Sequence, residues 1–295
     1  MQTPQTYQTP AQTPAVFPPQ HQGTQPGDSR VMNPVPVTDN PNYKPSGKLT
    51  GRVALISGGD SGIGQAVAIA FAKEGADIVI PYLQEDSNAQ DTQRAVEGLG
   101  RRCIPIPCDL KREQDARAVV DMAMGELKHI DILVNNIAVQ FPQNSVEDIT
   151  AEQLGNTFST NILSYFHMVK AALPHLAPGS AIINTTSVTA YKGSERLIDY
   201  SSTKGAIVSF TRSLALSLAK RGIRVNAVAP GPVWTPLIPS SFSAEDVAKF
   251  GQDTPLGRAA QPFELAPTYV YLASDDSGYV TGQVLHVNGG AITDS

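Results

Sequence analysis

Apolar and polar positions alternate regularly from about residue 50 to the end of the chain. Short apolar runs predict buried strands at residues 53–57, 78–82, 104–107, 132–135, 181–186, 225–229 and 284–287. Amphipathic stretches between the runs predict helices, among them 64–74, 114–127, 151–173 and 201–221. Strands that alternate with helices form a mostly parallel sheet covered by helices on both faces. The pattern therefore predicts one α/β domain, a doubly wound parallel sheet of about seven strands, over residues 47–295.

Residues 1–46 follow a different pattern. Ten of the 23 prolines and a recurrent Gln-Thr-Pro lie there, with almost no apolar periodicity. Such a segment buries too little apolar surface to offset the entropy lost on ordering. We therefore predict a disordered tail or an extended arm that lies on a partner subunit. A second irregular stretch, residues 230–261, is rich in Pro and Ser, is weakly helical around 244–250, and has the length of a binding lid.

The composition narrows the classes of protein. An apolar fraction of 41% and a charged fraction of 17% allow a sizeable core. The net charge of −5 argues against a general affinity for nucleic acid or anionic membranes, and no apolar run approaches the ~20 residues that cross a bilayer. The two cysteines, Cys103 and Cys108, are not expected to form a disulfide, and the five histidines show no paired metal-ligand spacing. We expect a cytoplasmic protein without a bound metal.

The clearest binding motif is the run Gly58-Gly-Asp-Ser-Gly62-Ile-Gly64, which follows the first predicted strand and precedes a helix. Free N–H groups at a helix N-terminus and the helix dipole together form an anion site. Glycines let the backbone turn sharply and approach a pyrophosphate without a Cβ in the way. The spacing is G-x-x-x-G-x-G, not the more familiar G-x-G-x-x-G. Its place after the first strand of an alternating chain predicts a dinucleotide cofactor.

The type of cofactor depends on the end of the second strand, where the adenosine ribose should lie. A carboxylate there bonds the 2′-hydroxyl of NAD and repels the 2′-phosphate of NADP. The strand ends in Tyr82-Leu83-Gln84, with neither an acidic nor a basic residue at its tip. The sequence leaves NAD and NADP open and favours NADP slightly, because the repelling carboxylate is missing.

Tyr200 and Lys204 are the first candidates for chemistry, since residues four apart on a helix share a face. A phenol titrates near pH ~10 and is a poor base at neutrality. A neighbouring ammonium favours the phenolate, and lowering the pKa to about 7 takes roughly 4 kcal/mol of differential stabilisation. Ser187 ends the strand predicted just before this helix. Because ligands bind beyond the carboxyl ends of parallel strands, its hydroxyl is placed to bond a substrate oxygen.

In their order and spacing, these motifs resemble the short-chain dehydrogenase/reductase family, in particular its glucose/ribitol dehydrogenase-like branch with a long N-terminal arm. The resemblance covers residues 47–295. It also uses Asp109, Asn135-Asn136, Asn161, the run Arg224-Val-Asn-Ala-Val-Ala-Pro-Gly231, Gly282-Gln and Val287-Asn-Gly-Gly290. It implies a Rossmann fold, a homotetramer in which the helices 151–173 and 201–221 pack against their mates, and oxidation or reduction of an alcohol/carbonyl pair.

The resemblance also implies a catalytic tetrad of Asn161, Ser187, Tyr200 and Lys204. Ser187 would orient the substrate oxygen, and Tyr200 would exchange a proton with it. Lys204 would tune Tyr200 and hold the nicotinamide ribose, while Asn161 would anchor a water that relays the proton. The predicted cofactor contacts are Gly58, Asp60, Ser61, Gly62, Ile63, Gly64, Tyr82, Leu83, Asp109, Leu110, Asn136, Ala138, Tyr200, Lys204, Pro230, Gly231, Val233 and Thr235.

One motif departs from the family pattern. Where the family has Asn-Asn-Ala-Gly, the chain reads Asn135-Asn136-Ile137-Ala138. The two added side chains would either crowd the backbone near the cofactor or fill core space.

The substrate pocket is predicted to include Ser187, Gln140, Tyr191 and Trp234, with Phe141, Val188 and the 230–261 loop around them. These aromatic and polar groups suit a sugar alcohol or a small aldehyde equally well, and the substrate stays open. Two other functions are considered: a nucleotide sensor of this fold without turnover, and a stress-related structural protein, suggested only by the tail. The complete tetrad favours the enzyme, because a sensor does not need a tuned phenol.

Overall fold

A seven-stranded parallel sheet forms the centre of the molecule in the computed structural model, which describes residues 14–292. The strands lie in the order β3-β2-β1-β4-β5-β6-β7. They are β1 (Val53–Ile56), β2 (Asp77–Tyr82), β3 (Cys103–Pro107), β4 (Ile132–Asn135), β5 (Ala181–Thr185), β6 (Arg224–Pro230) and β7 (Val284–Val287). The predicted single-domain, doubly wound parallel sheet is confirmed.

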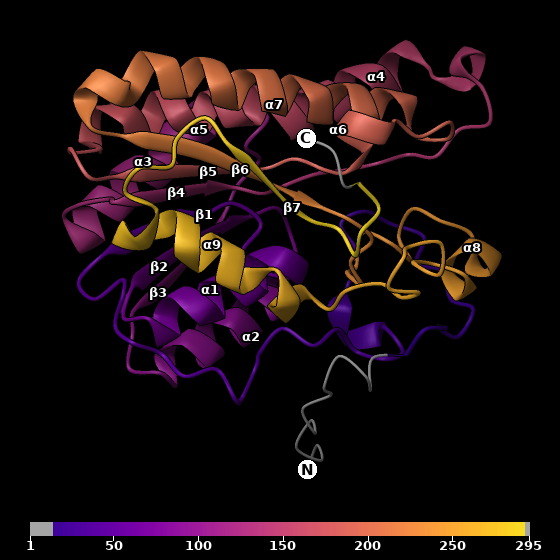
Figure 1. Cartoon of the computed structure of the whole chain (residues 1–295), viewed down its shortest axis with the longest axis horizontal. Helices are drawn as coiled ribbons and strands as arrows, with labels where there is room; N and C mark the ends of the chain where they lie inside the picture. Colours follow the sequence, from indigo (N-terminus) through magenta and orange to yellow (C-terminus); the bar gives the residue numbers. More distant parts are fainter. Residues whose placement is uncertain (1–13, 293–295) are drawn as a thin grey trace.

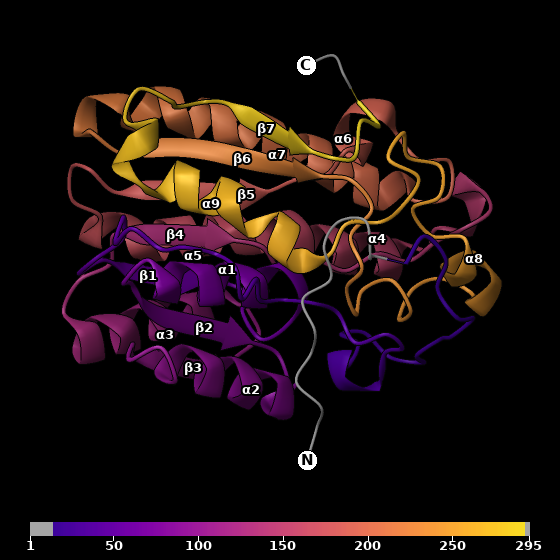
Figure 2. The ribbon, with the colours of Figure 1, turned by 60° about the horizontal axis from the view of Figure 1, so that its bottom comes forward.

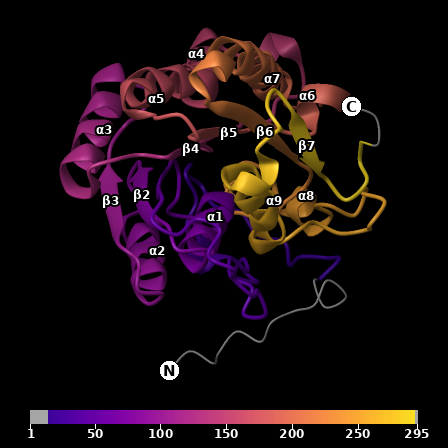
Figure 3. The same ribbon diagram turned by 60° about the vertical axis from the view of Figure 1, so that its left-hand side comes forward.

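Helices cover both faces of this sheet (Figures 1 and 3). One face carries α3 (Glu113–Leu127), α4 (Ala151–Phe158), α5 (Ser164–Ala172) and α7 (Ile198–Leu218). The other carries α1 (Gly62–Lys73), α2 (Asp86–Glu97) and α9 (Ala266–Ala273). Two short helices, α6 (Thr189–Lys192) and α8 (Ala244–Ala248), lie in the connections beyond the strand ends.

The core follows from the alternation of side chains along each strand. In β1, Val53 and Leu55 join the apolar cluster under α3, α5 and α7, whereas Ala54 and Ile56 join the cluster under α1 and α9. Successive strand residues point to opposite faces, so a strand that is apolar at every position is buried on both sides. This two-sided burial makes the strands continuous apolar runs that the sequence reveals.

The strand order reverses at β1, which pairs with β2 on one side and β4 on the other. The crossovers from β1 lead one way and those from β4 the other, which leaves a crevice beyond the carboxyl ends of these strands. The glycine motif after β1 and the segments after β2, β3 and β4 therefore meet at one edge of the sheet, where a ligand fits.

Several elements differ from the prediction. The helix expected over 151–173 is α4 and α5 joined by a π-helical turn, Ser159–Leu163. Helix α2 was not predicted because its sequence, DSNAQDTQRAVE, is mostly polar and offers little apolar periodicity. Helix α9, APTYVYLA, was not predicted either, because it is short and mostly apolar and so lacks the polar face that marks an amphipathic helix.

The N-terminal segment lies against its own domain. Residues 14–46, here called the arm, follow an irregular path with a short 3-10 helix at Ser29–Val31 and a turn at 41–42. Phe17 is buried against Trp234 with ring centroids 3.8 Å apart. Figure 2 shows the indigo arm beside the orange loop that carries α8. The contacts that the structure shows for these residues are within the chain, and the expected contact with a partner subunit stays a prediction. Residues 1–13 of the predicted tail lie outside the described part.

Over residues 14–292, no helix has the length and apolar character needed to cross a membrane. The same residues contain no group of three His, Cys, Asp or Glu side chains placed to hold a metal ion. Cys103 and Cys108 are both free thiols.

Candidate active site

A cleft of about 340 Å³ opens at the sheet edge where the strand order reverses. Its walls come from the glycine motif, the segments after β2, β3 and β4, the loop after β6 and the arm. A cleft of this size suits a small-molecule site. The predicted cofactor residues that line it are Gly58, Asp60, Ser61, Gly62, Ile63, Tyr82, Leu83, Asp109, Leu110, Asn136, Ala138 and Thr235.

The glycine motif is shaped by close backbone approaches. Gly58 and Gly62 have φ values of 67° and 52°, which other residues rarely adopt. Gly64 faces the preceding turn so closely that a Cβ there would stand 2.0 Å from the Gly58 carbonyl oxygen. Helix α1 begins at Gly62, and the side chain of its N-cap residue, Ser61, makes no capping hydrogen bond. The first N–H groups of α1 therefore point to the cleft without a side-chain acceptor, as a pyrophosphate site requires.

Carboxylates gather where the adenosine ribose is expected. Asp60 is buried, and burial raises its pKa to about 6, with the nearby Glu85 carboxylate adding to the rise. Glu85 lines the cleft one residue before α2, and burial raises its pKa as well. Glu85 was not predicted, because the strand tip was taken to end at Gln84, one residue earlier. The ribose end therefore has acidic groups that the strand tip alone did not reveal.

Beyond the cleft, Ser187 and Tyr200 come together from two different elements. Ser187 lies two residues after the end of β5, and its hydroxyl accepts hydrogen bonds from the backbone and side chain of Thr189. Tyr200 lies in the first turn of α7 and shares a side-chain hydrogen bond with Ser187. Both side chains are buried. The predicted phenol–hydroxyl pair is thus present at the carboxyl end of β5.

Lys204 lies one helical turn after Tyr200 and is almost fully buried at 1% exposure. Its Nζ donates a hydrogen bond of 2.9 Å to the carbonyl of Thr185 and stands 5.4 Å from the centre of the Tyr200 ring. A second bond joins the same two segments, because the Thr186 hydroxyl donates to the Lys204 carbonyl. These bonds fix the start of α7 to the end of β5.

Burial dominates the ionisation of this pair. It raises the pKa of the Tyr200 phenol to about 12, and the Ser187 hydrogen bond only partly opposes the rise. It lowers the pKa of the Lys204 ammonium to about 7. Among the protein's own groups burial outweighs any effect of Lys204, because a buried site penalises the phenolate and the ammonium alike. The expected lowering of the Tyr200 pKa, which also relies on the positive charge of the nicotinamide, stays a prediction. At neutral pH the phenol holds its proton and can donate it.

Asn161 lies in the π-helical turn and is fully buried. Its amide accepts from the Val139 N–H at 2.8 Å and donates to the Val139 carbonyl at 2.9 Å, and it also donates to the Thr203 hydroxyl. Single π turns are frequent at functional sites, because they redirect a side chain without ending the helix. Here the turn lets Asn161 join the loop after β4, which lines the cleft, to α7, which carries Tyr200.

A continuous set of hydrogen bonds connects the cleft with Ser187, Tyr200 and Lys204, here called the Tyr200 cluster, through Lys204. The Asn136 amide contacts the carbonyl of Ser57, at the base of the glycine motif, at 3.3 Å. The Thr185 hydroxyl donates to the Asn136 side chain at 3.2 Å, and the Thr185 carbonyl accepts from Lys204. The glycine motif and Lys204 are therefore connected through Asn136 and Thr185 at a single sheet edge.

The remaining predicted cofactor residues lie behind or beside the cleft. The N–H of Val188, next to Ser187, bonds the Pro230 carbonyl. Gly231 approaches Asn288 so closely that a Cβ would stand 2.7 Å from its backbone. Val233 is buried. Ile137, the departure from the family motif, packs into the core beside Gly58 and also lines the cleft. It therefore fills core space and also lies near the expected cofactor.

The predicted substrate residues are not all brought together. Gln140 is buried, with its side chain bonded to Ser241, and Tyr191 packs edge-on against His286 with ring centroids 4.6 Å apart. The assignment of Trp234 to the substrate pocket is wrong. The residue is fully buried under the arm, where its indole N–H donates to the Pro34 carbonyl, so it cannot form a pocket wall.

The cleft residues that were not predicted are Pro81, Glu85, Cys108, Lys111, Val139, Asn156, Thr160 and the arm residues Gln25–Gly27, while Pro236 and Leu237 were expected only as part of the 230–261 loop. Lys111 could have been predicted, because it stands close to Asp109 and Leu110, two predicted cofactor contacts just after a predicted strand. The arm residues could not have been predicted, because their contacts join distant parts of the chain.

The chain is similar in sequence to a family of reductases and to several oxidoreductases. Residues 58–292 match a family model described as Enoyl-(Acyl carrier protein) reductase. The chain is 60% identical over 272 residues to the uncharacterized oxidoreductase YhdF of Bacillus subtilis, covering 92% of this chain and 94% of that one. It is 52% identical to the glucose and ribitol dehydrogenase of Daucus carota, covering 94% and 97%. It is 50% identical to the NADPH-dependent aldehyde reductase 1, chloroplastic, of Arabidopsis thaliana, covering 94% and 98%.

Solved structures agree with these relatives. A short-chain type dehydrogenase/reductase from Mycobacterium marinum superposes with a TM-score of 0.77 at 32% identity, covering 84% of this chain and 98% of that one. A short chain dehydrogenase from Burkholderia cenocepacia, solved in complex with NADP, superposes with a TM-score of 0.78 at 29% identity, covering 83% and 99%.

Proposed function

Because the chain belongs to the short-chain dehydrogenase/reductase family, we propose that it interconverts an alcohol and its carbonyl compound by hydride transfer. Membership makes it an oxidoreductase, with NAD or NADP as the cofactor. The observation that carries the proposal is the hydrogen-bonded connection from the glycine motif through Asn136 and Thr185 to Lys204. That connection joins the glycine motif to Lys204, which lies one helical turn after the proposed acid–base group, Tyr200.

The residues of the cleft fit a dinucleotide. The uncapped start of α1 supplies N–H donors for the pyrophosphate. A side chain at Gly64 would collide with the Gly58 carbonyl and one at Gly62 would press on Thr235, so either would displace the turn that presents these donors. Asn136 and Asp109 lie where the adenosine half is expected. NAD(P), when bound, accepts or supplies the hydride.

The protein's own groups supply the proton and the positioning. In reduction, Tyr200 donates its phenolic proton to the substrate oxygen as the carbonyl carbon receives hydride, and in oxidation it takes the proton back. Ser187, bonded to the same phenol, orients that oxygen. Lys204 stabilises negative charge on Tyr200, and Asn161 fixes the loop that leads to the cleft. A positioned acid of this kind contributes about 10²–10⁴-fold to the rate.

The direct test follows the absorbance of the reduced nicotinamide with purified protein. Aldehydes, ketones, sugars and polyols are offered with NADH, NADPH, NAD and NADP. We expect turnover with at least one carbonyl or alcohol, and we expect aldehydes and sugars to be the productive classes, as the names of two relatives indicate for those proteins. Cofactor binding without turnover across the panel would favour a sensor, and absence of both would refute the proposal.

Glu85→Gln is expected to shift cofactor preference toward NADP(H). Removing a carboxylate from the ribose end lessens its repulsion of the 2′-phosphate, while the uncharged 2′-hydroxyl of NAD(H) gains nothing from the change. We expect the ratio of kcat/KM for NADP(H) to that for NAD(H) to rise about tenfold, which is about 1.4 kcal/mol. The matched control is Glu97→Gln, at the exposed far end of α2. An unchanged or lower ratio would show that Glu85 does not face the ribose.

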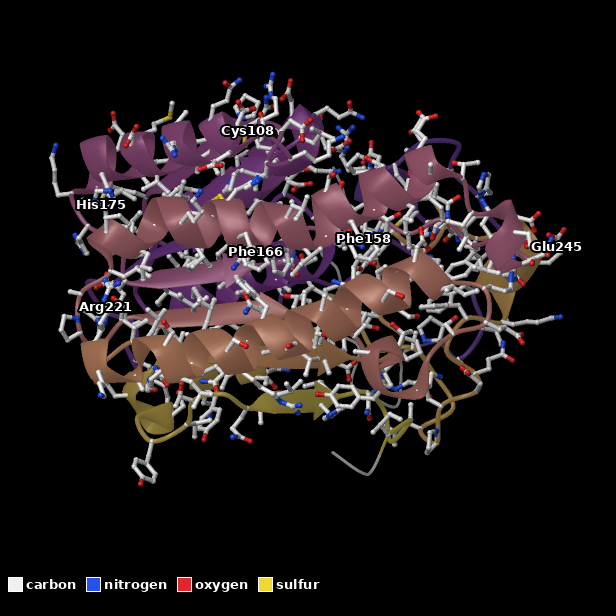
Figure 4. The ribbon with its side chains drawn as sticks, turned by 90° about the horizontal axis from the view of Figure 1, so that it is seen from above. Cys108, Phe158, Phe166, His175, Arg221 and Glu245 are labelled. Atoms are coloured by element: carbon white, nitrogen blue, oxygen red, sulfur yellow. The ribbon has the colours of Figure 1, made fainter. Side chains whose placement is uncertain are left out.

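The assembly and location stay predictions. Support for a homotetramer comes from large apolar side chains left exposed on the outer helix layer, among them Leu163, Phe166 and Leu216. Figure 4 views this layer, with Phe166 between α5 and α7, where its ring lies 4.1 Å from that of Phe210. Such a surface suits a contact between identical subunits. The predicted cytoplasmic location rests on the two free thiols, and one relative is described as chloroplastic.

A further inference from the structure

Part of the N-terminal arm forms a compact loop against the cofactor cleft. The side chain of Gln22 donates to the Asp28 carbonyl at 2.9 Å and accepts from the Asp28 N–H at 2.7 Å, which closes residues 22–28 into a loop, here called the arm loop. The tip of the arm loop, Gln25, Pro26 and Gly27, lines the cleft. The cleft therefore has a wall that comes from outside the Rossmann domain.

One side of the arm loop is bonded to the segment after β4. The Gln25 amide donates to the Gln140 carbonyl at 2.7 Å and accepts from the Gln140 N–H at 3.2 Å. The Gln140 side chain in turn donates to the Ser241 hydroxyl at 2.8 Å. Gln25 thus bonds a segment that Asn161 also holds, through Val139, beside the catalytic cluster.

The other side of the arm loop contacts the segment after β6. The Gln22 N–H donates to the Pro239 carbonyl at 2.7 Å. At Gly27 the approach is so close that a Cβ would stand 2.7 Å from the Pro236 carbonyl oxygen and 3.1 Å from the Ser240 Cβ. Only glycine fits this contact without movement of the backbone. The arm loop therefore bridges the two segments that flank the cleft.

The attachment of the arm is uneven. Its base is held by apolar burial, with Phe17 stacked on Trp234 and Met32 in the same cluster. The arm loop is held to the domain mainly by hydrogen bonds. Directly after it, the Ser29 hydroxyl donates a bond of 3.0 Å to the buried Asn88 of α2. A segment held by few polar contacts between firmly packed anchors opens locally at low cost. The tip can therefore lift while the base stays in place.

We propose that the arm loop is a functional wall of the dinucleotide site in its own chain, and that NAD(P) enters and leaves when this wall lifts. Gln25 and Gly27 are positioning residues, since they hold the wall against the flanking segments. This inference rests on the proposed function, because the cleft is taken to be the cofactor site.

The test measures rates of NADPH and NADH binding and release by stopped-flow nucleotide fluorescence in the full-length protein. Gln25→Ala removes both bonds to Gln140, and Gly27→Ala pushes the arm loop away from Pro236. The matched controls are Gln252→Ala, at an exposed position, and Gly23→Ala, where a Cβ meets nothing within 4 Å. Thermal unfolding of each variant checks that the base of the arm and the domain stay folded.

We expect both the association and the dissociation rate constants to rise about tenfold in Gln25→Ala and in Gly27→Ala, with both controls like the wild type and the thermal midpoint little changed. A gate slows passage both ways, so a rise in dissociation alone would overturn the gating role. Unchanged rates in both variants, with dinucleotide binding intact, would overturn the inference and leave the proposed function standing. A wild-type protein that binds neither dinucleotide would overturn both.

Discussion

Tyr200→Phe is expected to lower kcat about a thousandfold while the Kd for NAD(P)H stays within about twofold of the wild type. The hydroxyl is the only part of the side chain that is removed, and it holds the proton that the substrate oxygen receives. Its pKa of about 12 keeps it protonated at neutral pH. The aromatic ring that packs near Lys204 remains, so the buried site keeps its shape.

The control for this prediction is Tyr191→Phe. Tyr191 is a second tyrosine beyond the end of β5, but it packs against His286, and Glu195 rather than a lysine stands four residues later. We expect Tyr191→Phe to retain kcat within a fewfold of the wild type. Steady-state kinetics and a fluorescence titration of NADPH measure the two quantities. A Tyr200→Phe enzyme as active as the wild type would exclude Tyr200 as the acid.

Gly62→Val is expected to raise the Kd for NAD(P)H about a hundredfold, which is about 2.7 kcal/mol. Gly62 starts α1 with a φ of 52°, and a Cβ there would stand 3.1 Å from the side chain of Thr235. A β-branched residue suits neither the positive φ nor the narrow space. The first turn of α1 must therefore shift, and the N–H groups that face the pyrophosphate shift with it.

Gly125→Val is the matched control for Gly62→Val. Gly125 also lies in a helix, α3, but it is exposed and a Cβ there meets nothing within 4 Å. We expect its cofactor affinity to match the wild type. Isothermal titration with NADPH and NADH gives the dissociation constants, and circular dichroism confirms folding. Wild-type affinity in a folded Gly62→Val protein would mean that the glycine motif does not hold the cofactor.

The parts that the sequence predicted are those with a local cause. The strands are buried on both faces, so they are apolar at successive positions, as in Val53–Ile56. The glycine motif follows β1 directly, and Tyr200 and Lys204 are one helical turn apart. In each case the geometry depends on neighbours in the chain, and it can be inferred from spacing.

The parts that the sequence missed depend on distant contacts. Trp234 was assigned to the substrate pocket, but Phe17 covers its ring, and nothing in the local sequence indicates that pairing. The π-helical turn exists because Asn161 bonds Val139 and Thr203, which belong to two other segments. The burial that raises the pKa of Tyr200 was not anticipated, because burial cannot be inferred from a four-residue spacing.

We infer that the cofactor cleft and the Tyr200 cluster are the two halves of one active site. A crystal structure of the protein with NADP or NAD bound tests it most directly, through the distance from the nicotinamide C4 to the Tyr200 Oη. With a carbonyl carbon about 3–3.5 Å from C4 and its oxygen in hydrogen-bond reach of the phenol, we expect the two atoms to stand roughly 4–6 Å apart. A nicotinamide ring more than about 10 Å from Tyr200, or a pyrophosphate away from the start of α1, would contradict the account.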